Sequence, residues 1–220
     1  MTTNSTSLDT SFLNLVPQLI EKLKEVLPGA SAHQRMESDY RRKLDGTVQL
    51  NDPKQSAVLF LLYPDESGET CAAFILRQSN LSIHSNQISL PGGRTEESDR
   101  SFEETALRET HEEIGVEPQN VTIIGKLTEV LIPRSGFLVH PYVGFAAERP
   151  TFKLQIEEVA DLYEVKLADL FHHETKSTHH ITDAQGNRYT APSYLIAGRH
   201  LWGATAMMMA EVEEILNPRY

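Results

Sequence analysis

Residues 89–116, SLPGGRTEESDRSFEETALRETHEEIGV, are the stretch that decides how this chain folds. They open with a Pro-Gly-Gly turn, which a polar loop follows, and then carry the signals of a helix. Ser101 and Glu104 form the S-x-x-E pattern of a capping box, so we expect the helix to begin near residue 102. Gly115 is placed to end it in the left-handed conformation. The stretch therefore predicts a glycine turn that leads into one capped helix.

Three glutamates of this helix indicate its chemistry. Glu109, Glu112 and Glu113 are spaced so that all three project from one helical face, where like charges repel by roughly a few tenths of a kcal/mol per pair. A hard divalent cation relieves that repulsion, and carboxylate oxygens are ligands that Mg²⁺ or Mn²⁺ prefers. The alternative is a solvated acidic face on which Arg108 makes ordinary surface pairs. The glycine turn, the loop and the Arg-Glu pair together favour the metal site.

Composition limits the classes of protein to which the chain can belong. Of its 220 residues, 40% are hydrophobic and 23% are charged, which is typical of a soluble globular protein. The net charge of −11 argues against a general nucleic-acid binder, which needs basic patches for phosphate contacts. This negative charge is compatible with a phosphate-bearing small molecule as ligand, because a bound metal ion can reverse the electrostatic potential locally. Cys71 is the only cysteine, which excludes an intrachain disulfide and a zinc-thiolate site.

The sequence predicts a cytoplasmic protein with no membrane association. No apolar run approaches the ~20 residues of a membrane span. The first ten residues, MTTNSTSLDT, lack the charged start and apolar core of a signal peptide.

The order of predicted elements favours an α+β fold with a mixed sheet over a doubly wound parallel fold. Apolar runs and alternation predict strands at 56–63, 70–77, 88–90, 121–130, 137–146 and 157–162, and a hairpin from 177–181 and 188–194. Helical spacing predicts an N-terminal helix over 17–27 with Pro17 in its first turn, a helical turn within 165–171, and a terminal helix over 201–216. Residues 30–54 are polar and read as a connector. We expect a helical extension over 1–34 and a main domain over 35–220.

Part of this stretch resembles the Nudix box of the Nudix hydrolases, G-x5-E-x7-R-E-U-x-E-E-x-G-U. Its second half, RETHEEIGV, fits at each defined position except that Thr110 stands where an aliphatic residue is usual. In the first half, the carboxylate after Gly93 is Asp99 instead of Glu, and eight residues separate it from Arg108 instead of seven. A loop that is longer by one residue is associated with the coenzyme A pyrophosphatase branch.

The resemblance implies an α/β/α sandwich, in which a mixed sheet lies between helices and the box forms a site for Mg²⁺ or Mn²⁺. It implies hydrolysis of a nucleoside diphosphate linked to another moiety, with Arg108, Glu109, Glu112 and Glu113 as the catalytic residues. By motif position the three glutamates are metal ligands, and Arg108 holds a ligand carboxylate. Asp99 is a weaker candidate for an outer role. Glu158 is the choice for a further metal or base carboxylate, with a plain surface glutamate as the alternative.

A second resemblance concerns the substrate. Upstream of the box, the chain is similar to the extra signature of coenzyme A pyrophosphatases at Arg77, Ser79, Leu81, His84, Gln87 and the Pro-Gly-Gly turn. Ile83 replaces an expected arginine, which removes a natural contact to a substrate phosphate. Residues 134–144, 158–160 and 202–206 resemble the same branch.

This branch implies cleavage of coenzyme A or its thioesters to 3′,5′-ADP and 4′-phosphopantetheine. The substrate-binding candidates are Arg77, His84, Gln87, Gly92, Gly93 and Arg134. Two alternatives stay open: the same chemistry on ADP-ribose, NADH or a nucleoside triphosphate, and a ligand-sensing Nudix module without catalysis. Retention of the box glutamates favours the enzyme. The apolar faces of the two terminal helices leave a homodimer open.

Overall fold

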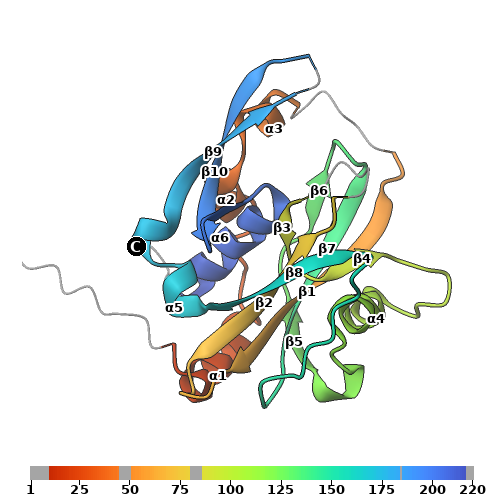
Figure 1. Ribbon diagram of the computed structural model, residues 1–220, viewed down its shortest axis with the longest axis vertical. Coiled ribbons are helices and arrows are strands. Elements are labelled where there is room, and N and C mark those ends of the chain that lie inside the picture. The colour runs from red at the N-terminus through yellow and green to blue at the C-terminus, as the bar shows by residue number, and fades with distance from the viewer. Residues whose placement is uncertain (1–9, 45–50, 80–85, 184, 217–220) are drawn as a thin grey trace, which may run out of the picture.

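An eight-stranded mixed sheet lies between helices in the computed structural model, which describes residues 10–44, 51–79, 86–183 and 185–216 (Figure 1). Its main path runs β3-β2-β1-β7-β5, and β4, β6 and β8 pair with β1, β7 and β2. The strands are β1 (Lys54–Pro64), β2 (Thr70–Arg77), β3 (Ile88–Ser89), β4 (Gly92–Arg94), β5 (Thr122–Lys126), β6 (Val130–Ile132), β7 (Phe137–Phe145) and β8 (Val159–Lys166). The predicted fold class, a mixed sheet flanked by helices, is confirmed.

Strand β1 organises the sheet. It pairs in parallel with β7 over its first nine residues and antiparallel with β2 and β4. Because successive side chains of a strand point to opposite faces, its apolar run SAVLFLLY supplies both faces of the sheet at once. A nearly continuous apolar run is the pattern expected of a strand that is covered on both sides.

Each face of the sheet has its own hydrophobic core. On one face, Leu59 and Leu61 pack in a cluster with Ala106 and Ile114 of α4 (Phe102–Ile114). On the other face, Phe60 and its neighbours pack with α1 (Phe12–Lys22) and α6 (Ala204–Leu216). Complete burial of a Leu or Phe side chain contributes about 1.5–3 kcal/mol, so the two clusters fix α4 against one side of the sheet and α1 and α6 against the other.

Helix α1 begins earlier than the sequence predicts. It starts at Phe12 and runs through Pro17, so the expected start at Pro17 is wrong. Proline inside a helix removes one backbone hydrogen bond, but burial of Leu15 and Leu19 in the α1–α6 core outweighs that loss. At its other end, Lys22 donates from Nζ to the carbonyl oxygen of Ile215 at 2.8 Å, which fastens α1 to the end of α6. The domain boundary at residue 35 stays a prediction.

A smaller sheet and the short helix α2 pack around α6 (Figure 1). The sheet is antiparallel and has three strands, β9 (Lys176–Thr182), β10 (Arg188–Ile196) and β11 (Arg199–Trp202). The hairpin of β9 and β10 was expected, whereas β11 takes the start of the expected helix at residue 201, so α6 begins only at Ala204. The expected connector at 30–54 holds α2 (Ala30–His33), α3 (Asp39–Leu44) and the first residue of β1. Helix α5 (Leu167–Leu170) follows β8.

A buried carboxylate ties these segments to α6. Glu211 has no exposed surface, and it accepts hydrogen bonds from the backbone N–H of Gly29 (3.1 Å) and from the N–H and hydroxyl of Thr128 (3.1 and 2.6 Å). Its Oε2, which accepts the Thr128 N–H, also lies 3.1 Å from Nε2 of His33. Hydrogen bonds from His33 and Thr128 overcome the effect of burial and hold the pKa of Glu211 below its usual value. The methionines of α6 are buried in the same region and belong to the core.

Across the described ranges, no helix combines the length and the apolar character that crossing a membrane requires.

Candidate active site

The helix that carries the glutamates is capped as its sequence predicts. The Ser101 hydroxyl accepts a hydrogen bond from the Glu104 N–H at 3.2 Å, and Gly115 ends α4 with φ of 74°. The return bond of the capping box is displaced by one residue, since the Glu104 carboxylate accepts from the N–H of Arg100 at 2.7 Å. Both predicted ends of the helix are confirmed.

Glu113 is the innermost carboxylate of the site. Its side chain is 1% exposed, and Oε2 accepts a hydrogen bond of 2.8 Å from the N–H of Gly92. Its Oε1 lies 3.3 Å from Nη1 of Arg77 but has no hydrogen-bond donor among the described residues. Burial raises the pKa of Glu113 to about 7, against the opposing effects of Arg77 and Gly92. A buried carboxylate oxygen without a donor calls for a further partner.

The two glycines of the turn allow the backbone to approach this helix. A Cβ atom on Gly93 would lie 2.4 Å from Oε2 of Glu109, and one on Gly92 would lie 2.3 Å from the carbonyl oxygen of Ala57. Neither distance is compatible with a side chain. The turn therefore brings β4 against β1 on one side and against the Glu109 carboxylate on the other.

Arg108 joins the loop to the glutamates. Its Nε and Nη2 donate to the two oxygens of Asp99, both at 2.9 Å, and Nη2 also donates to the carbonyl oxygen of Arg94 at 3.0 Å. Its Nη1 donates to Glu109 and Glu112, each at 3.0 Å. One guanidinium thus connects the loop of the box with two of its three glutamates.

Asp99 makes more contacts than the outer role predicted for it from the sequence requires. Its carboxylate is 2% exposed, and it accepts from the Thr105 hydroxyl (2.8 Å) and the Glu96 N–H (2.9 Å) as well as from Arg108. The Arg108 guanidinium holds the pKa of Asp99 well below its usual range. The longer loop folds around this carboxylate, which makes Asp99 its anchor. The unusual spacing was the signal in the sequence, but nothing in the sequence indicated Thr105.

The three glutamates differ in burial although they share one helical face. Glu113 is buried, the Glu109 side chain is 14% exposed and the Glu112 side chain is 55% exposed. Burial raises the pKa of Glu109, and Glu158 adds a repulsion that raises the pKa of both Glu109 and Glu113. Glu158 therefore lies within electrostatic reach of the helix, although it comes from the turn just before β8.

The donor set suits a hard divalent cation. Carboxylate oxygens are the ligands of Mg²⁺ and Mn²⁺, and Oε1 of Glu113 is an oxygen that has no donor in the described part of the chain. Among the described residues, no three His, Cys, Asp or Glu side chains are already gathered as a metal site. Glu109 and Glu112 are instead turned toward Arg108.

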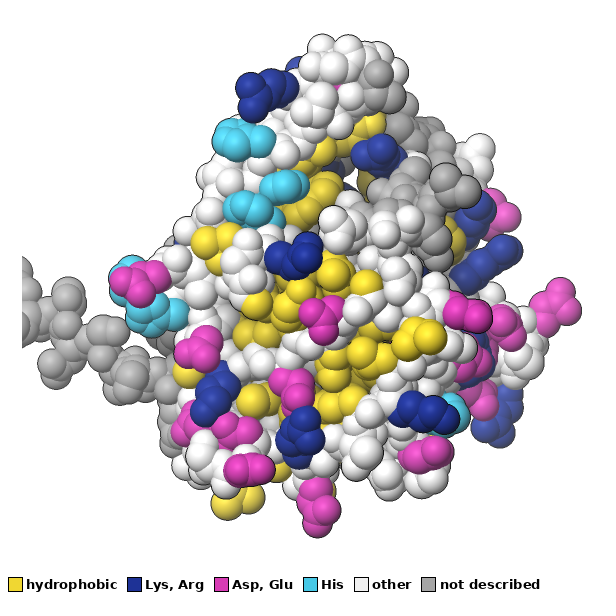
Figure 2. Space-filling model, in the orientation of Figure 1, with side chains coloured by type: hydrophobic (Ala, Val, Ile, Leu, Met, Phe, Trp, Pro, Cys, Tyr) yellow, Lys and Arg dark blue, Asp and Glu magenta, His cyan; other side chains and the backbone are white. Residues whose placement is uncertain are grey.

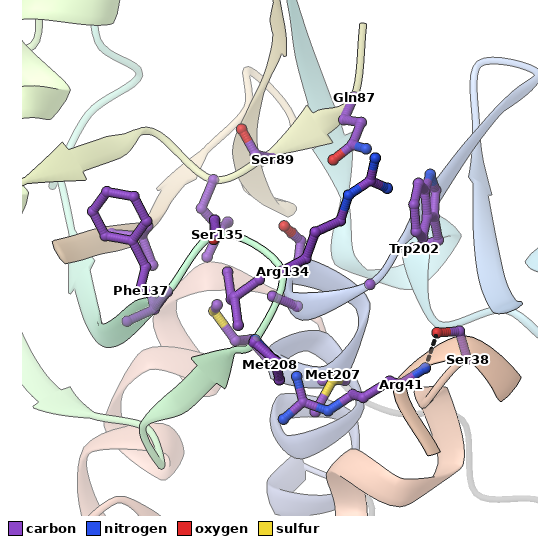
Figure 3. Close-up of a pocket in the computed structure, with 18 of the residues that line it drawn as sticks. Ser38, Arg41, Gln87, Ser89, Arg134, Ser135, Phe137, Trp202, Met207 and Met208 are labelled. Carbon is purple, nitrogen blue, oxygen red and sulfur yellow. Dashed lines mark hydrogen bonds between the residues drawn. The ribbon is translucent and has the colours of Figure 1, made fainter. Parts of the chain in front are cut away.

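Five of the six substrate-binding candidates line one cavity. Arg77, Gln87, Gly92, Gly93 and Arg134 all contribute to a cavity of about 440 Å³ beside β4, whereas His84 lies outside the described residues. Figure 3 shows Arg134 extending from the turn between β6 and β7 toward Gln87 and Trp202. The opposite wall comes from α3, the β9–β10 hairpin and α6. That wall was missed, because α3 lies within the segment that was expected to be a connector.

Comparison with known proteins gives matches over most of the chain. The family model of the NUDIX domain matches residues 53–184. The mitochondrial coenzyme A diphosphatase NUDT8 of Homo sapiens is 29% identical over 81% of this chain and 77% of its own. The Nudix hydrolase NudL of Pectobacterium atrosepticum, itself uncharacterized, is 34% identical over 65% of this chain and 73% of its own. The peroxisomal coenzyme A diphosphatase ndx-8 of Caenorhabditis elegans is 31% identical over 66% and 62%.

Solved structures share the fold. The MutT protein of Methanosarcina mazei Go1 superposes with a TM-score of 0.51 at 17% identity, over 78% of this chain and all of that one. A MutT/nudix family protein of Enterococcus faecalis has a TM-score of 0.50 at 18% identity, over 82% and 69%.

Proposed function

The chain belongs to the Nudix family of hydrolases, and from that membership we propose that it is a metal-dependent pyrophosphatase that cleaves coenzyme A or its thioesters. The products are 3′,5′-ADP and 4′-phosphopantetheine, or the acylated form of the latter. The proposal rests on the contact between the Pro-Gly-Gly turn and α4. There, Glu113 is tied to the Gly92 N–H and keeps one oxygen without a donor.

The residues of the box have distinct parts in this proposal. Glu109, Glu112 and Glu113 would hold Mg²⁺ or Mn²⁺, which when bound neutralises the diphosphate and acidifies a water molecule. Arg108 orients Glu109 and Glu112 through its two hydrogen bonds of 3.0 Å, and Asp99 fixes Arg108 from the other side. Partners of this kind typically change activity 10- to 100-fold when they are removed.

Two residues outside the helix complete the site. Arg77 lies 3.3 Å from Glu113 and lines the cavity, so its guanidinium is placed to bind a phosphate of the substrate. Glu158 is exposed and near enough to raise the pKa of Glu109 and Glu113, which suits a carboxylate that accepts a proton from the attacking water. Its alternative role is that of a further metal ligand.

Two facts support coenzyme A as the substrate. Two relatives of this chain are named as coenzyme A diphosphatases. In addition, Arg77, Gln87 and the Pro-Gly-Gly turn, which carry the resemblance to that branch, all border one cavity. Arg134 lines it as well and supplies a further exposed cation.

A substrate panel tests the proposal. Coenzyme A, ADP-ribose, NADH and a nucleoside triphosphate are each incubated with Mg²⁺ or Mn²⁺, and products are separated by chromatography. We expect 3′,5′-ADP from coenzyme A as the fastest reaction. Cleavage of ADP-ribose while coenzyme A stays intact would overturn the substrate assignment. A Glu113→Gln variant should lose turnover, whereas Glu117→Gln, an exposed glutamate just beyond α4, should keep it.

A further inference from the structure

The position of the Glu158 carboxylate depends on its backbone and not on contacts of its side chain. Glu158 lies in the turn of residues 155–158, which is exposed and leads into β8. Figure 2 shows isolated acidic side chains among hydrophobic ones on the face that β8 crosses in Figure 1. Across the described ranges, no hydrogen bond or ion pair holds the Glu158 carboxylate. Its place near α4 therefore depends on what fixes the turn.

A β-bulge directs the chain from β8 into this turn. Asp161 of β8 pairs with Leu76 of β2. The next pair is Val159 with Arg77, so the register skips Ala160. A bulge of this kind bends the strand and changes the direction of nearby side chains, and bulges are common next to active sites. This bulge lies beside Arg77, at the edge of the proposed diphosphate site.

Helix α4 holds one side of the turn. The Gln155 N–H donates to the carbonyl oxygen of Glu113 at 3.0 Å, and the Lys153 N–H donates to that of Ile114 at 2.9 Å. Both acceptors belong to the last turn of the helix, where carbonyl groups have no partner within the helix. All of these donors and acceptors are backbone groups, so they are available whatever the side chains are.

Gln78 holds the other side of the turn. Its backbone N–H donates to the carbonyl oxygen of Glu158 at 2.8 Å, and its side-chain Nε2 donates to that of Ile156 at 2.7 Å. The Ile156 side chain is 74% exposed, so its packing does not fix the turn. The Gln78 amide is therefore a side-chain contact that fastens the turn to the end of β2.

We propose that Gln78 is a positioning residue for the reaction, which holds the turn so that the Glu158 carboxylate stays beside Glu109 and Glu113. The inference rests on the proposed function, in which Glu158 either accepts a proton from the attacking water or binds a metal ion. In both roles a small displacement of the carboxylate lowers the rate, because catalysis depends on accurate placement of the reacting groups. Gln78 acts through Glu158 and contacts no reacting atom.

Hydrogen–deuterium exchange of the metal-free protein tests whether Gln78 holds the turn. Gln78→Met keeps the length of the side chain and removes its amide, and Gln18→Met, at an exposed position of α1, is the matched control. The Glu158 and Val159 N–H groups both donate to the carbonyl oxygen of Gln155 within the turn. Loss of the Gln78 side-chain hydrogen bond should speed their exchange about tenfold. Amides of α6 should exchange at the wild-type rate, which separates release of the turn from unfolding, and the control should match the wild type throughout.

A double-mutant cycle tests whether Gln78 acts through Glu158. With coenzyme A and Mg²⁺, Gln78→Met should lower kcat about tenfold and leave KM within about twofold of wild type, since no contact to the substrate is lost. Adding Gln78→Met to a Glu158→Gln variant should lower kcat no further, because the carboxylate that Gln78 positions is already absent. Gln18→Met should leave kcat unchanged in both backgrounds.

Three results would overturn the inference. Unchanged exchange in Gln78→Met would show that the amide does not hold the turn. An equal fall of kcat in both backgrounds, or a rise of KM in place of a fall of kcat, would show that Gln78 acts on the fold or on the substrate. Wild-type turnover by Glu158→Gln would remove this carboxylate from the mechanism.

Failure of the proposed function is distinguishable from these results. If the wild type cleaves no diphosphate, the proposed function is wrong and the positioning role is wrong with it. If it cleaves ADP-ribose and leaves coenzyme A intact, only the substrate assignment is wrong, and the same cycle is measured with ADP-ribose. If coenzyme A is cleaved and the cycle shows no coupling, only the role of Gln78 is wrong.

Discussion

Replacing Asp99 with Asn tests the link between the loop and the catalytic helix. The Asp99 carboxylate is 2% exposed and receives two charge-assisted hydrogen bonds of 2.9 Å from Arg108. Hydrogen bonds to charged groups contribute about 1.5–3 kcal/mol each. In Asp99→Asn, the side-chain oxygen still accepts one of these hydrogen bonds, but without the negative charge. Arg108 keeps its hydrogen bonds to Glu109 and Glu112. We therefore expect a loss of about 2 kcal/mol.

The expected loss can be measured in two ways. For a chain of this size, each kcal/mol lowers the Tm by about 2–4 °C, so Asp99→Asn should melt about 4–8 °C below the wild type. Because Arg108 also orients two glutamates, kcat should fall about 10- to 100-fold. Asp52→Asn, which changes an exposed aspartate, is the matched control and should alter neither quantity.

The pH dependence provides a third test. Arg108 lowers the pKa of Asp99 in the folded protein. This carboxylate therefore contributes its full stabilisation above its unfolded pKa of about 4, and that contribution is lost progressively as the pH falls from there toward the lowered folded pKa. The Tm difference between wild type and Asp99→Asn should therefore shrink in acid. A variant with wild-type Tm and wild-type kcat at neutral pH would refute the anchoring role of Asp99.

Three further predictions follow from the geometry. Gly93→Ala would place a Cβ 2.4 Å from Oε2 of Glu109, so we expect kcat to fall more than tenfold, as a steady-state assay with the cleaved substrate will show. Glu113→Gln should abolish turnover but keep or raise the Tm in thermal unfolding, because it removes a buried charge whose pKa burial raises to about 7. Glu211 has a lowered pKa in the folded state, so its stabilisation is present above an unfolded pKa of about 4.3 and is lost in more acidic solution. Glu211→Gln should therefore lower the Tm at pH 7, and the difference in Tm between variant and wild type should become smaller toward pH 3.

The elements that were predicted correctly are those with local signals. Ser101 and Gly115 fix the ends of α4 through contacts within the helix itself, and these ends are confirmed. The apolar run at 56–63 needs no distant partner to be recognised as a buried strand, and β1 covers it. The hairpin of β9 and β10 follows from its turn and the flanking alternation.

The errors arise where distant segments decide the outcome. Helix α1 continues through Pro17 because its apolar face is buried against α6, which lies almost 190 residues away along the chain. Helical spacing treats Glu109, Glu112 and Glu113 as equivalent, whereas only the packing of β4 against α4 shows that Glu113 is innermost. The cavity is made from six or more separate segments, so no single stretch of sequence contains its pattern.

The catalytic residues and most of the cavity wall come from different segments of the chain. The carboxylates and the glycine turn lie within residues 92–113, whereas much of the apolar wall comes from α3, the β9–β10 hairpin and α6. Arg77 belongs to both, because it contacts Glu113 and faces the cavity. Substitutions in α3 or α6 can therefore change which molecule is accepted and leave the bond-breaking apparatus untouched. Such a division makes this protein a scaffold whose selectivity can be redesigned independently of its reaction.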